Sequence, residues 1–529
     1  MKKAFAFICA AALLVTPAAL FAGPEGEEMA SADELTAPGI FPIEPSITMV
    51  AGHTWTHDPE DNPWIQSWAE PTGVNLEWVL MDSTEKMSIV FASDDYPAMM
   101  FGVTGLHKNL IAQLLQEGVV TDLRQHLGKG YTPNLDQIFA EKPEALAYMM
   151  NPQGQMQALA RFHFLESNYL EQNYMVNRRW LDALGLDAPT TTGELRDVLI
   201  AFRDGDPNGN GEADEIPFAF VTNDGFAQHL RSMYGIWGMP TKNGIAIRDG
   251  QAYFAPITQG YRDMITYMAD LYSEGLIDPE SFTMNSNDFN AKVDDPSGNI
   301  YGFVVARRGF TPVNDATANR GEFESIPPLR APGYEPEMWV HPGRLAIKNV
   351  WFMTDVNPYP EHTMAFVDRF YTLENSVQAQ FGFAPEGIAQ ENGVWVPQPI
   401  DPERRAQIAT AGTFPSIFRE EDFGPNLAMD KTTQFLFDQY YEHYVRFKAK
   451  EQWVRAEFAA DEQTEVNTLR TDIDTLWKTN QARWITGAGN IDDEWDDYVQ
   501  QMKNMGIDRY VELHHAAHSR FLNEVGDYR

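Results

Sequence analysis

Residues 47–102 have the sequence ITMVAGHTWTHDPEDNPWIQSWAEPTGVNLEWVLMDSTEKMSIVFASDDYPAMMFG, and this stretch decides the fold class of the chain. It holds three short apolar runs, separated by two segments with helical signals. Asp61 and Asn62 stand before Pro63, and this order is typical of a helix start, because Asp or Asn caps a first turn that accommodates proline. The order strand, helix, strand, helix, strand predicts a parallel sheet in an α/β fold. The expected strands are 47–51, 74–79 and 97–101.

The rest of the chain continues this mixture of helices and strands. At roughly 150 residues per domain, 529 residues indicate two to four domains or lobes. We expect 106–150 to be mostly helical, and 258–275 to form one amphipathic helix because its apolar residues recur at helical spacing. Strands are expected at 299–306 and near 345–353. Helices dominate from about residue 430 to the end.

The N-terminal segment, residues 1–22, has the pattern of a secretory signal peptide. Lys2 and Lys3 precede a stretch of apolar and small residues that ends at Ala22, where we expect cleavage. The stretch is short for a membrane span, although a retained anchor helix is the alternative. We interpret residues 23–44, which are acidic and rich in proline, as a flexible leader.

Composition restricts both the compartment and the partners. The only cysteine, Cys9, lies inside the signal peptide, too early to carry a lipid anchor, so the mature chain should lack thiols, disulfides and a lipid anchor. The 76 acidic residues exceed the 39 basic residues, and the net charge of -37 repels phosphate backbones, which argues against a nucleic-acid partner. We therefore predict a free periplasmic or secreted protein, and we expect a monomer.

Five phrases of the sequence occur in an order that is typical of one family. Together they span most of the mature chain: FASDDYPAMMFG (91–102), RRWLDALGL (178–186), DGDPNGNGEADEIPF (204–218), LYSEGLIDPESFT (271–283) and WITGAGNIDDEWDDYV (484–499). On these phrases the chain resembles the family 1 extracellular solute-binding proteins of bacterial ABC importers, in the large branch that includes alginate- and oligosaccharide-binding proteins. One departure is HHAAHSR at 514–520, where relatives usually carry a glutamine, an aromatic and an acidic residue.

The resemblance implies a fold and a function. The fold is α/β, a two-lobed periplasmic-binding-protein type II fold with a hinge and a helical C-terminal part. We place the first lobe at 45–160, the second lobe, with a calcium loop, at 161–325, and further hinge crossings and helices of both lobes at 326–529. The implied function is to capture an oligosaccharide or polysaccharide fragment between the lobes and deliver it to the membrane permease of an ABC transporter, without catalysing a reaction.

The segment DPNGNGEADE, residues 206–215, has the spacing of a calcium-binding loop. Oxygen-bearing side chains recur at its first, third and fifth positions, glycine provides the sharp turn at the sixth, and a hard cation needs about six to eight oxygens. The twelfth position is Pro217, which has no side-chain oxygen, so we assign the bidentate role to Glu215. A surface turn that binds no metal is the alternative. The expected ligands of a structural calcium ion are Asp206, Asn208, Asn210, Glu212, Asp214 and Glu215.

A sugar site needs flat aromatic side chains beside planar polar groups, because sugar rings present apolar faces with a rim of hydroxyls. In the fold that the resemblance implies, such contacts come from loops after strands and from hinge crossings. Core packing is the alternative for each aromatic residue, and a solvated pair is the alternative for Arg307 and Arg308. If these two arginines face the cleft, they favour an acidic sugar, because guanidinium groups match carboxylates. The candidate ligand-binding residues are Trp55, Arg161, Tyr169, Trp237, Arg307, Arg308, Trp339 and Arg344.

Two other functions share these sequence features. A secreted, calcium-dependent carbohydrate-active enzyme, a glycosidase or a lyase, would need two positioned carboxylates, and the sequence contains many acids. A surface recognition or sensor protein is a weaker alternative.

His514 and His518 have a spacing that can hold zinc on a helix, but no third ligand is evident, and a solvated or hydrogen-bonded helix end is the simpler interpretation.

Overall fold

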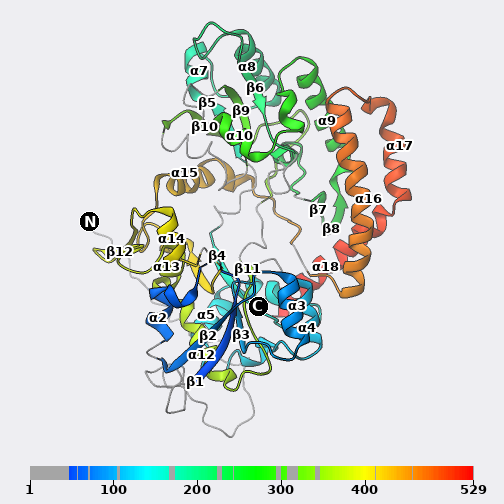
Figure 1. Cartoon of the computed structure of the whole chain (residues 1–529). Coiled ribbons are helices and arrows are strands. Elements are labelled where there is room, and N and C mark those ends of the chain that lie inside the picture. Colours follow the sequence, from blue (N-terminus) through cyan, green and yellow to red (C-terminus); the bar gives the residue numbers. More distant parts are fainter. Residues whose placement is uncertain are drawn as a thin grey trace, which may run out of the picture.

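The computed structural model shows two lobes, one above the other in Figure 1. Each lobe is built on its own β-sheet, and helices pack against the sheets. We call the lower lobe, which contains the N-terminal sheet, the first lobe, and the upper lobe the second. This is the two-lobed α/β architecture that the sequence predicted. The described residues are 47–55, 57–69, 72–103, 108–165, 173–222, 229–241, 243–293, 300–306, 320–339, 346–410, 413–454 and 457–527.

The first lobe contains a six-stranded sheet. Its strands, with the two helices that connect the first three, are β1 (Ile47–His53), α2 (Pro63–Ala69), β2 (Val74–Leu80), α3 (Thr84–Ala92), β3 (Met99–Phe101), β4 (Leu159–Phe164), β11 (Ala346–Met353) and β14 (Ser416–Arg419). The strand order is β14-β4-β11-β3-β1-β2. Strand β1 pairs in parallel with both β2 and β3, so the predicted parallel unit of three strands and two helices is confirmed.

Helix α2 begins where the sequence predicts, and Asn62 is its cap. The Oδ1 atom of Asn62 accepts hydrogen bonds from the backbone nitrogens of Trp64 at 3.0 Å and Ile65 at 3.3 Å, and Pro63 opens the helix. These bonds satisfy amide groups that have no partner inside the helix. Trp64 and Ile65 then pack into the core of the first lobe, which fixes the helix against the sheet.

Five strands of the first sheet end at one edge, which we call the interlobe edge. Because β11 is antiparallel to β3 and β4, and β14 is parallel to β4, the carboxyl ends of β1, β2, β3, β4 and β14 lie together there, beside the start of β11. The chain leaves β4 at Phe164 and enters the second sheet at Asn173, so this edge faces the second lobe. The lobe boundary expected at residue 160 falls inside β4.

The second lobe contains a four-stranded sheet with the order β10-β5-β9-β6 and a separate β7-β8 hairpin. The predicted strand at 299–306 and helix at 258–275 are confirmed as β9 and α9. The elements are β5 (Asn173–Asn177), α7 (Arg178–Leu184), α8 (Thr192–Asp204), β6 (Ile216–Ala219), β7 (Ile245–Arg248), β8 (Gln251–Phe254), α9 (Gln259–Ser273), α10 (Ser286–Val293), β9 (Tyr301–Ala306) and β10 (Phe323–Ile326).

Further helices complete the first lobe, in agreement with the helical character expected for 106–150. Its apolar core lies between the sheet and these helices and includes several large aromatic side chains. The additional elements are α4 (Lys108–Gln116), α5 (Pro133–Glu141), α6 (Pro143–Met149), α12 (Pro360–Asp368), α13 (Leu373–Phe381), β12 (Ile388–Glu391), β13 (Val394–Pro397) and α14 (Pro402–Ile408).

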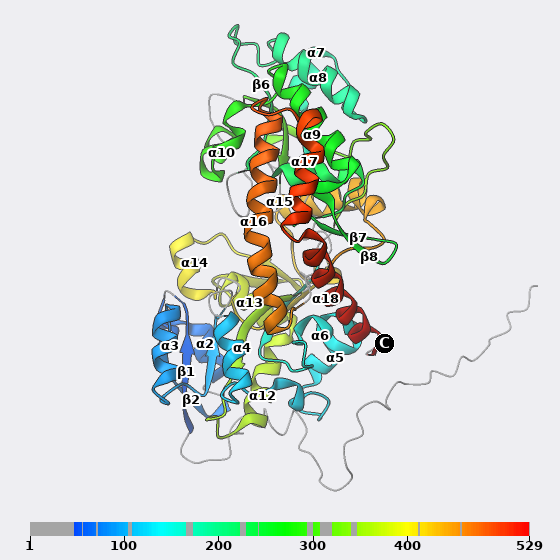
Figure 2. The same cartoon turned by 90° about the vertical axis from the view of Figure 1, so that its right-hand side faces the viewer.

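The C-terminal part is helical, as expected, and it joins the two lobes. Its helices are α15 (Lys431–Gln439), α16 (Ala460–Ile485), α17 (Ile491–Asn504) and α18 (Ile507–Asp527). Helix α16 begins beside the first lobe and runs up to pack on α9 of the second, and α18 returns past β8 to pack on α6 (Figure 2). Within the described residues, none of the helices combines the length and apolar character that a bilayer span requires.

A buried hydrogen-bond network connects Tyr444, in the segment that follows α15, to the second lobe. The hydroxyl of Tyr444 accepts from the backbone nitrogen of Tyr174 at 3.1 Å and lies 2.9 Å from the hydroxyl of Ser325. It is within donating distance of Asn173 Oδ1 at 2.8 Å and of the Ile326 carbonyl oxygen at 2.9 Å. Strand β5 starts and strand β10 ends at this point, so the network lies where the chain enters and leaves the second sheet.

Replacing Tyr444 by Phe should lower the free energy of unfolding by about 1–3 kcal/mol, because Asn173 and Ser325 would keep buried polar groups with fewer partners. Tyr441→Phe is the matched control, since the Tyr441 side chain is 44% exposed. Urea denaturation followed by circular dichroism measures both variants. Equal losses for the two variants would contradict the importance of the network.

Candidate functional site

Aromatic side chains gather where β1 and β2 reach the interlobe edge. The rings of His53, Trp55 and Trp78 have centroids 5.6 to 5.7 Å apart. Trp55 also lies 6.0 Å from both Phe101 and Phe414. Trp55 and Trp78 are only half-buried, and partly exposed rings at such an edge are the kind of surface on which a sugar ring stacks.

Two contacts hold the indole of Trp55 in place. Its Nε1 donates a hydrogen bond to the Thr413 hydroxyl at 2.8 Å. Gly102 lies beside the same nitrogen; it has a φ of +77°, and its carbonyl accepts a hydrogen bond from the Thr54 hydroxyl. A Cβ atom at position 102 would come within 2.8 Å of Trp55 Nε1, so glycine is required here both for the backbone and for the indole.

His53 is buried, in contrast to the half-buried Trp55 and Trp78 beside it. Burial lowers its pKa to about 4, against a smaller raising effect of Asp58, and Lys86 lowers it further. The imidazole is therefore neutral at pH 7 and packs as an aromatic ring. Its Nδ1 atom is buried and has no hydrogen-bond partner among the described residues.

Arg161 lies in β4 but is packed between strands. Its Nε donates to His163 Nε2 at 2.7 Å, and its guanidinium lies 5.5 Å from the ring centroid of Phe418 in β14. Burial, together with the charge of Arg161, holds the pKa of His163 well below its usual range. The side chain of Arg161 is 8% exposed, so its predicted ligand contact stays a prediction.

The two tryptophans predicted as ligand contacts outside the first lobe are packed in the interior. Trp237 is 4% exposed and lies 5.5 Å from the ring of Tyr267. Trp339 is 2% exposed, and its Nε1 lies 3.5 Å from the carbonyl oxygen of Trp453. Their predicted contact with ligand remains untested. Four further candidates lie outside the described residues: Tyr169, Arg307, Arg308 and Arg344.

The structure reveals further aromatic residues that could contact a ligand and that the sequence alone did not indicate. Trp78 stands near the carboxyl end of the second strand, and the rule that ligands bind beyond such ends would have selected it. Tyr441 is 44% exposed, packs 5.0 Å from Phe437, and directly follows α15, which lies between the lobes in Figure 1. Phe414 carries no local signal, because its place beside Trp55 depends on long-range packing.

The predicted calcium loop closes around its own oxygen atoms. The carboxylate of Asp206 accepts hydrogen bonds from the backbone nitrogens of Asn210 and Gly211, both at 3.1 Å. The carboxylate of Asp214 accepts from the side-chain amides of Asn208 at 2.8 Å and Asn210 at 3.0 Å. Four of the six expected ligand side chains are thus joined in one hydrogen-bonded loop.

Glu215 has the environment of a carboxylate that lacks a counter-charge. Its Oε1 atom is buried and has no hydrogen-bond partner among the described residues. Burial raises its pKa, backbone hydrogen bonds from Glu215 itself and from Asn208 lower it, and the nearby charges of Asp214 and Asp206 raise it, with a net upward shift. A cation in this loop would relieve both effects, and the oxygen-only donor set suits calcium. No group of three or more His, Cys, Asp or Glu side chains in the described chain could hold a metal ion; two of the ligands expected here are asparagines.

The topology places this loop far from the interlobe edge. It joins the end of α8 to the start of β6. Strand β6 is parallel to β9 and β9 is antiparallel to β5, which starts at the hinge, so β6 begins at the remote edge of the second sheet and runs toward the first lobe. A cation bound in the loop would therefore act on the stability of the second lobe and would not contact a ligand between the lobes.

The histidines considered for zinc are buried in α18. His514 and His518 are 4% and 5% exposed, and burial lowers the pKa of each to about 4. The Nδ1 of His514 lies 2.8 Å from the carbonyl oxygen of Tyr510, one helical turn earlier. His514 therefore fits the simpler interpretation from the sequence, a hydrogen-bonded histidine in a helix.

Comparison with known proteins identifies homologues along nearly the whole chain. No protein-family model matches it. The fructooligosaccharide ABC transporter substrate-binding protein FusA of Streptococcus pneumoniae is 26% identical over 534 residues, which cover 96% of this chain and 97% of FusA. The polygalacturonan/rhamnogalacturonan-binding protein YtcQ of Bacillus subtilis is 25% identical over 232 residues, 42% of this chain and 44% of YtcQ. These homologues are binding proteins, which favours the binding interpretation over the enzyme alternative.

Solved structures have the same fold. An EF-hand mutant of S. pneumoniae FusA in complex with fructo-nystose has a TM-score of 0.73 at 24% identity and covers 90% of this chain and 100% of its own. An HMO-binding, ABC-transporter-associated solute-binding protein from Bifidobacterium longum infantis has a TM-score of 0.76 at 20% identity, and the match covers 90% of this chain and 99% of that protein. The resemblance to solute-binding proteins of ABC importers and the two-lobed fold that it implies are both confirmed.

Acidification should destabilise the interlobe edge through His53. Its pKa is about 4 in the folded protein and 6.5 in a model peptide, so the unfolded chain binds the proton first and stability falls as the pH drops from 6.5 toward 4. The stability gap between wild type and His53→Asn should therefore shrink by roughly 1–2 kcal/mol between pH 7 and pH 5, measured by urea unfolding. Exposed His57 provides the control, and an equal pH dependence for His57→Asn would refute this assignment.

Proposed function

We propose that this protein is the solute-binding component of an ABC importer and that it captures an oligosaccharide or polysaccharide fragment between its lobes. The observation that carries the proposal is the half-buried aromatic group of Trp55 and Trp78 at the interlobe edge. The nearly end-to-end match to FusA, a fructooligosaccharide transporter protein, supports a sugar ligand. The protein binds its ligand without chemical change and passes it to the permease subunits of the transporter.

Lobe closure is the step that the proposal requires. A ligand between the lobes contacts both of them only when they approach each other, so it favours the closed state and this state is what the permease recognises. On the first lobe the contacts come from Trp55 and Trp78, and on the second lobe Tyr441 is the described aromatic side chain with the most exposed surface. Tyr169, Arg307, Arg308 and Arg344 stay candidates for the remaining contacts.

Calcium is the proposed structural cofactor. Asp206, Asn208, Asn210, Asp214 and Glu215 would supply side-chain oxygens, and Glu212 its backbone carbonyl. The buried and unpartnered oxygen of Glu215 supports this assignment. One solved structure of FusA is that of an EF-hand mutant, and an EF-hand in this homologue supports a calcium loop here. The cation would supply only charge compensation and loop rigidity.

The proposal places the mature protein, from residue 23 onward, in the periplasm or outside the cell, as a monomer without a lipid anchor. The signal-peptide pattern and the homology to ABC transporter substrate-binding proteins support this localisation. The same placement is compatible with a secreted glycosidase or lyase, and catalytic turnover distinguishes the two.

The first test is isothermal titration of the mature protein with a panel of neutral and acidic oligosaccharides in the presence of calcium. One sugar class should bind with a stoichiometry near one and emerge unchanged from chromatography. Trp55→Ala should weaken that binding by roughly ten-fold or more, because an aromatic stacking surface is lost. Breakdown of the sugar would overturn the assignment in favour of an enzyme.

The matched control for this test is Tyr96→Ala. Tyr96 precedes β3 and therefore lies at the opposite edge of the same sheet, where its hydroxyl donates to Asp355 at 2.7 Å. Its removal should leave the binding constant unchanged. If both variants lose binding equally, the loss reflects a general change in the first lobe and the interlobe edge is not the site.

Replacing Asp206 and Asp214 together by Ala should lower the melting temperature by several degrees only when calcium is present, because a ligand of the native state stabilises by mass action. Asp270→Ala, an exposed carboxylate on α9, is the control and should respond to calcium as wild type does. A wild-type melting temperature that is identical with calcium and with a chelator would rule out the calcium site.

A further inference from the structure

A hollow of about 340 Å³ lies on the side of the first lobe where α16 begins. Its walls come from α4, the end of α6, the segment before β4, strand β11 and the first turns of α16. Gln157 precedes β4, and the six residues of that strand separate it by roughly 20 Å from the end of β4 at the interlobe edge. We call this hollow the amide pocket, and it is distinct from the aromatic group around Trp55.

The side chains of the amide pocket have an unusual chemistry. Eight of the fifteen residues that line it are Asn or Gln, none is Lys or Arg, and a single carboxylate, Glu457, is present. Each carboxamide offers donors and acceptors in one plane, which matches hydroxyl groups that both donate and accept. Met149, Met150 and Phe458 add apolar surface for the C–H face of a sugar ring. An anionic ligand would find no counter-charge in this pocket.

The conformation and burial of Asn349 indicate a specific binding site rather than an accidental groove. It lies in an irregular stretch of β11, where the pairing with β4 shifts register between Ile347 and Trp351. Its φ is +60°, a conformation that costs a non-glycine residue on the order of 1 kcal/mol and that asparagine tolerates best. The side chain is 5% exposed, lines the pocket, and accepts a long hydrogen bond of 3.4 Å from Gln157 Nε2. Bulges of this kind redirect side chains beside functional sites.

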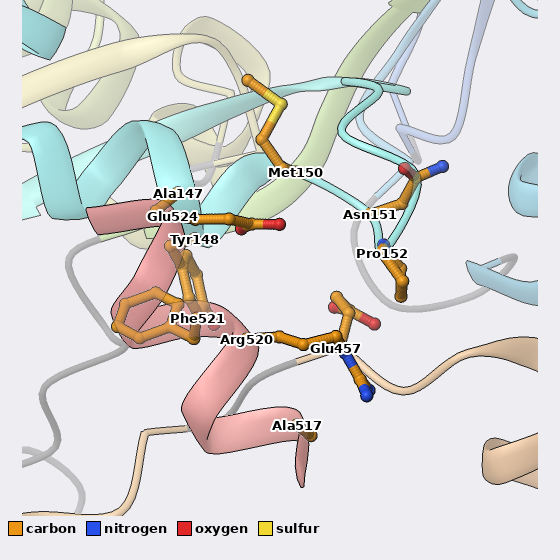
Figure 3. Close-up of a pocket in the computed structure, with 10 residues that line it drawn as sticks. All are labelled: Ala147, Tyr148, Met150, Asn151, Pro152, Glu457, Ala517, Arg520, Phe521 and Glu524. Carbon is orange, nitrogen blue, oxygen red and sulfur yellow. The ribbon is translucent and has the colours of Figure 1, made fainter. Parts of the chain in front are cut away.

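Two contacts fix the position of α16, which forms one wall of the pocket. At its start, Glu462 forms an ion pair with Arg520 of α18, with Nη1 and Oε1 3.0 Å apart. Figure 3 shows the neighbouring small hollow between α6 and α18, where Arg520 lies beside Glu457. Four residues line both this hollow and the amide pocket: Met150, Asn151, Pro152 and Glu457. Further along, Trp477 Nε1 donates to Tyr261 of α9 at 3.1 Å. The pocket therefore sits between the first lobe and a helix anchored on the second, and pockets between domains are favoured ligand sites.

From these observations we infer that the amide pocket is a second binding site, for an uncharged sugar or polyol of up to disaccharide size. Gln116, Gln157, Asn349, Gln463 and Asn467 provide the hydrogen bonds, and Phe458 provides the stacking surface. This site goes beyond the proposed function and does not depend on a ligand between the lobes.

The test uses the mature protein labelled with ¹³C at the methionine methyl groups, because Met149 and Met150 line the pocket. Sucrose is the probe, and their signals are assigned by replacing each with Leu. Sucrose should shift both signals saturably, with a dissociation constant of roughly a millimolar. Asn349→Gly keeps the backbone conformation and removes the amide, and Gln463→Leu keeps the side-chain size. Each should weaken the binding roughly five-fold, the value of one hydrogen bond.

Two controls separate this pocket from the interlobe site. Gln137→Leu, on the exposed face of α5, should leave the titration unchanged. Trp55→Ala should also leave it unchanged, even if no sugar binds between the lobes, so failure of the proposed function cannot mimic failure of the second site. Shifts that never saturate, or that disappear in Trp55→Ala, would overturn the inference. So would unchanged binding in both Asn349→Gly and Gln463→Leu.

Discussion

The structure depends on one topological constraint: the chain leaves and re-enters the first sheet through its central strands. Strands β4 and β11 are neighbours inside the sheet, and the end of β4 and the start of β11 both lie at the interlobe edge. Parallel strands bring their carboxyl ends to the same edge, so β1 and β2 deliver His53, Trp55 and Trp78 to the edge from which the hinge passages emerge. The aromatic surface and the hinge therefore lie at the same edge of the sheet. The contacts of a ligand bound there would depend on the angle between the lobes.

Buried polar groups secure this boundary where apolar packing alone would allow sliding. The Tyr444 hydroxyl joins the start of β5 and the end of β10 through Asn173 and Ser325. A buried hydrogen-bonded group has few alternative positions, because leaving it unpaired is costly. Helices α16 and α18 add a second connection that bypasses the strands and reaches both lobes. The amide pocket lies where the start of α16 approaches α4 and the end of α6 in the first lobe.

The aromatic group at the interlobe edge and the 206–215 loop differ in their electrostatics. The net charge is -37, yet the aromatic group contains a neutral histidine whose pKa is about 4. The 206–215 loop, in contrast, gathers carboxylates at the remote edge of the second sheet, where the buried oxygen of Glu215 lacks a partner. Repulsion among these groups is a local instability that a divalent cation would remove. The proposed calcium loop and the proposed ligand contacts therefore lie at opposite edges of the second lobe.

The sequence by itself determined what depends on neighbours along the chain. The parallel unit at residues 47–101, the cap at Asn62 and the helix at 258–275 follow from capping, propensity and periodicity, which act over a few residues, and the loop spacing at 206–215 is of the same kind. Only the tertiary structure decided which tryptophans face the interlobe edge. Trp55 is half-buried, and its indole bonds Thr413, 358 residues away. Trp237 and Trp339, for which the sequence raised the same expectation, are buried by contacts that the sequence does not display. Side-chain exposure is set by packing between distant segments, and no local pattern encodes it.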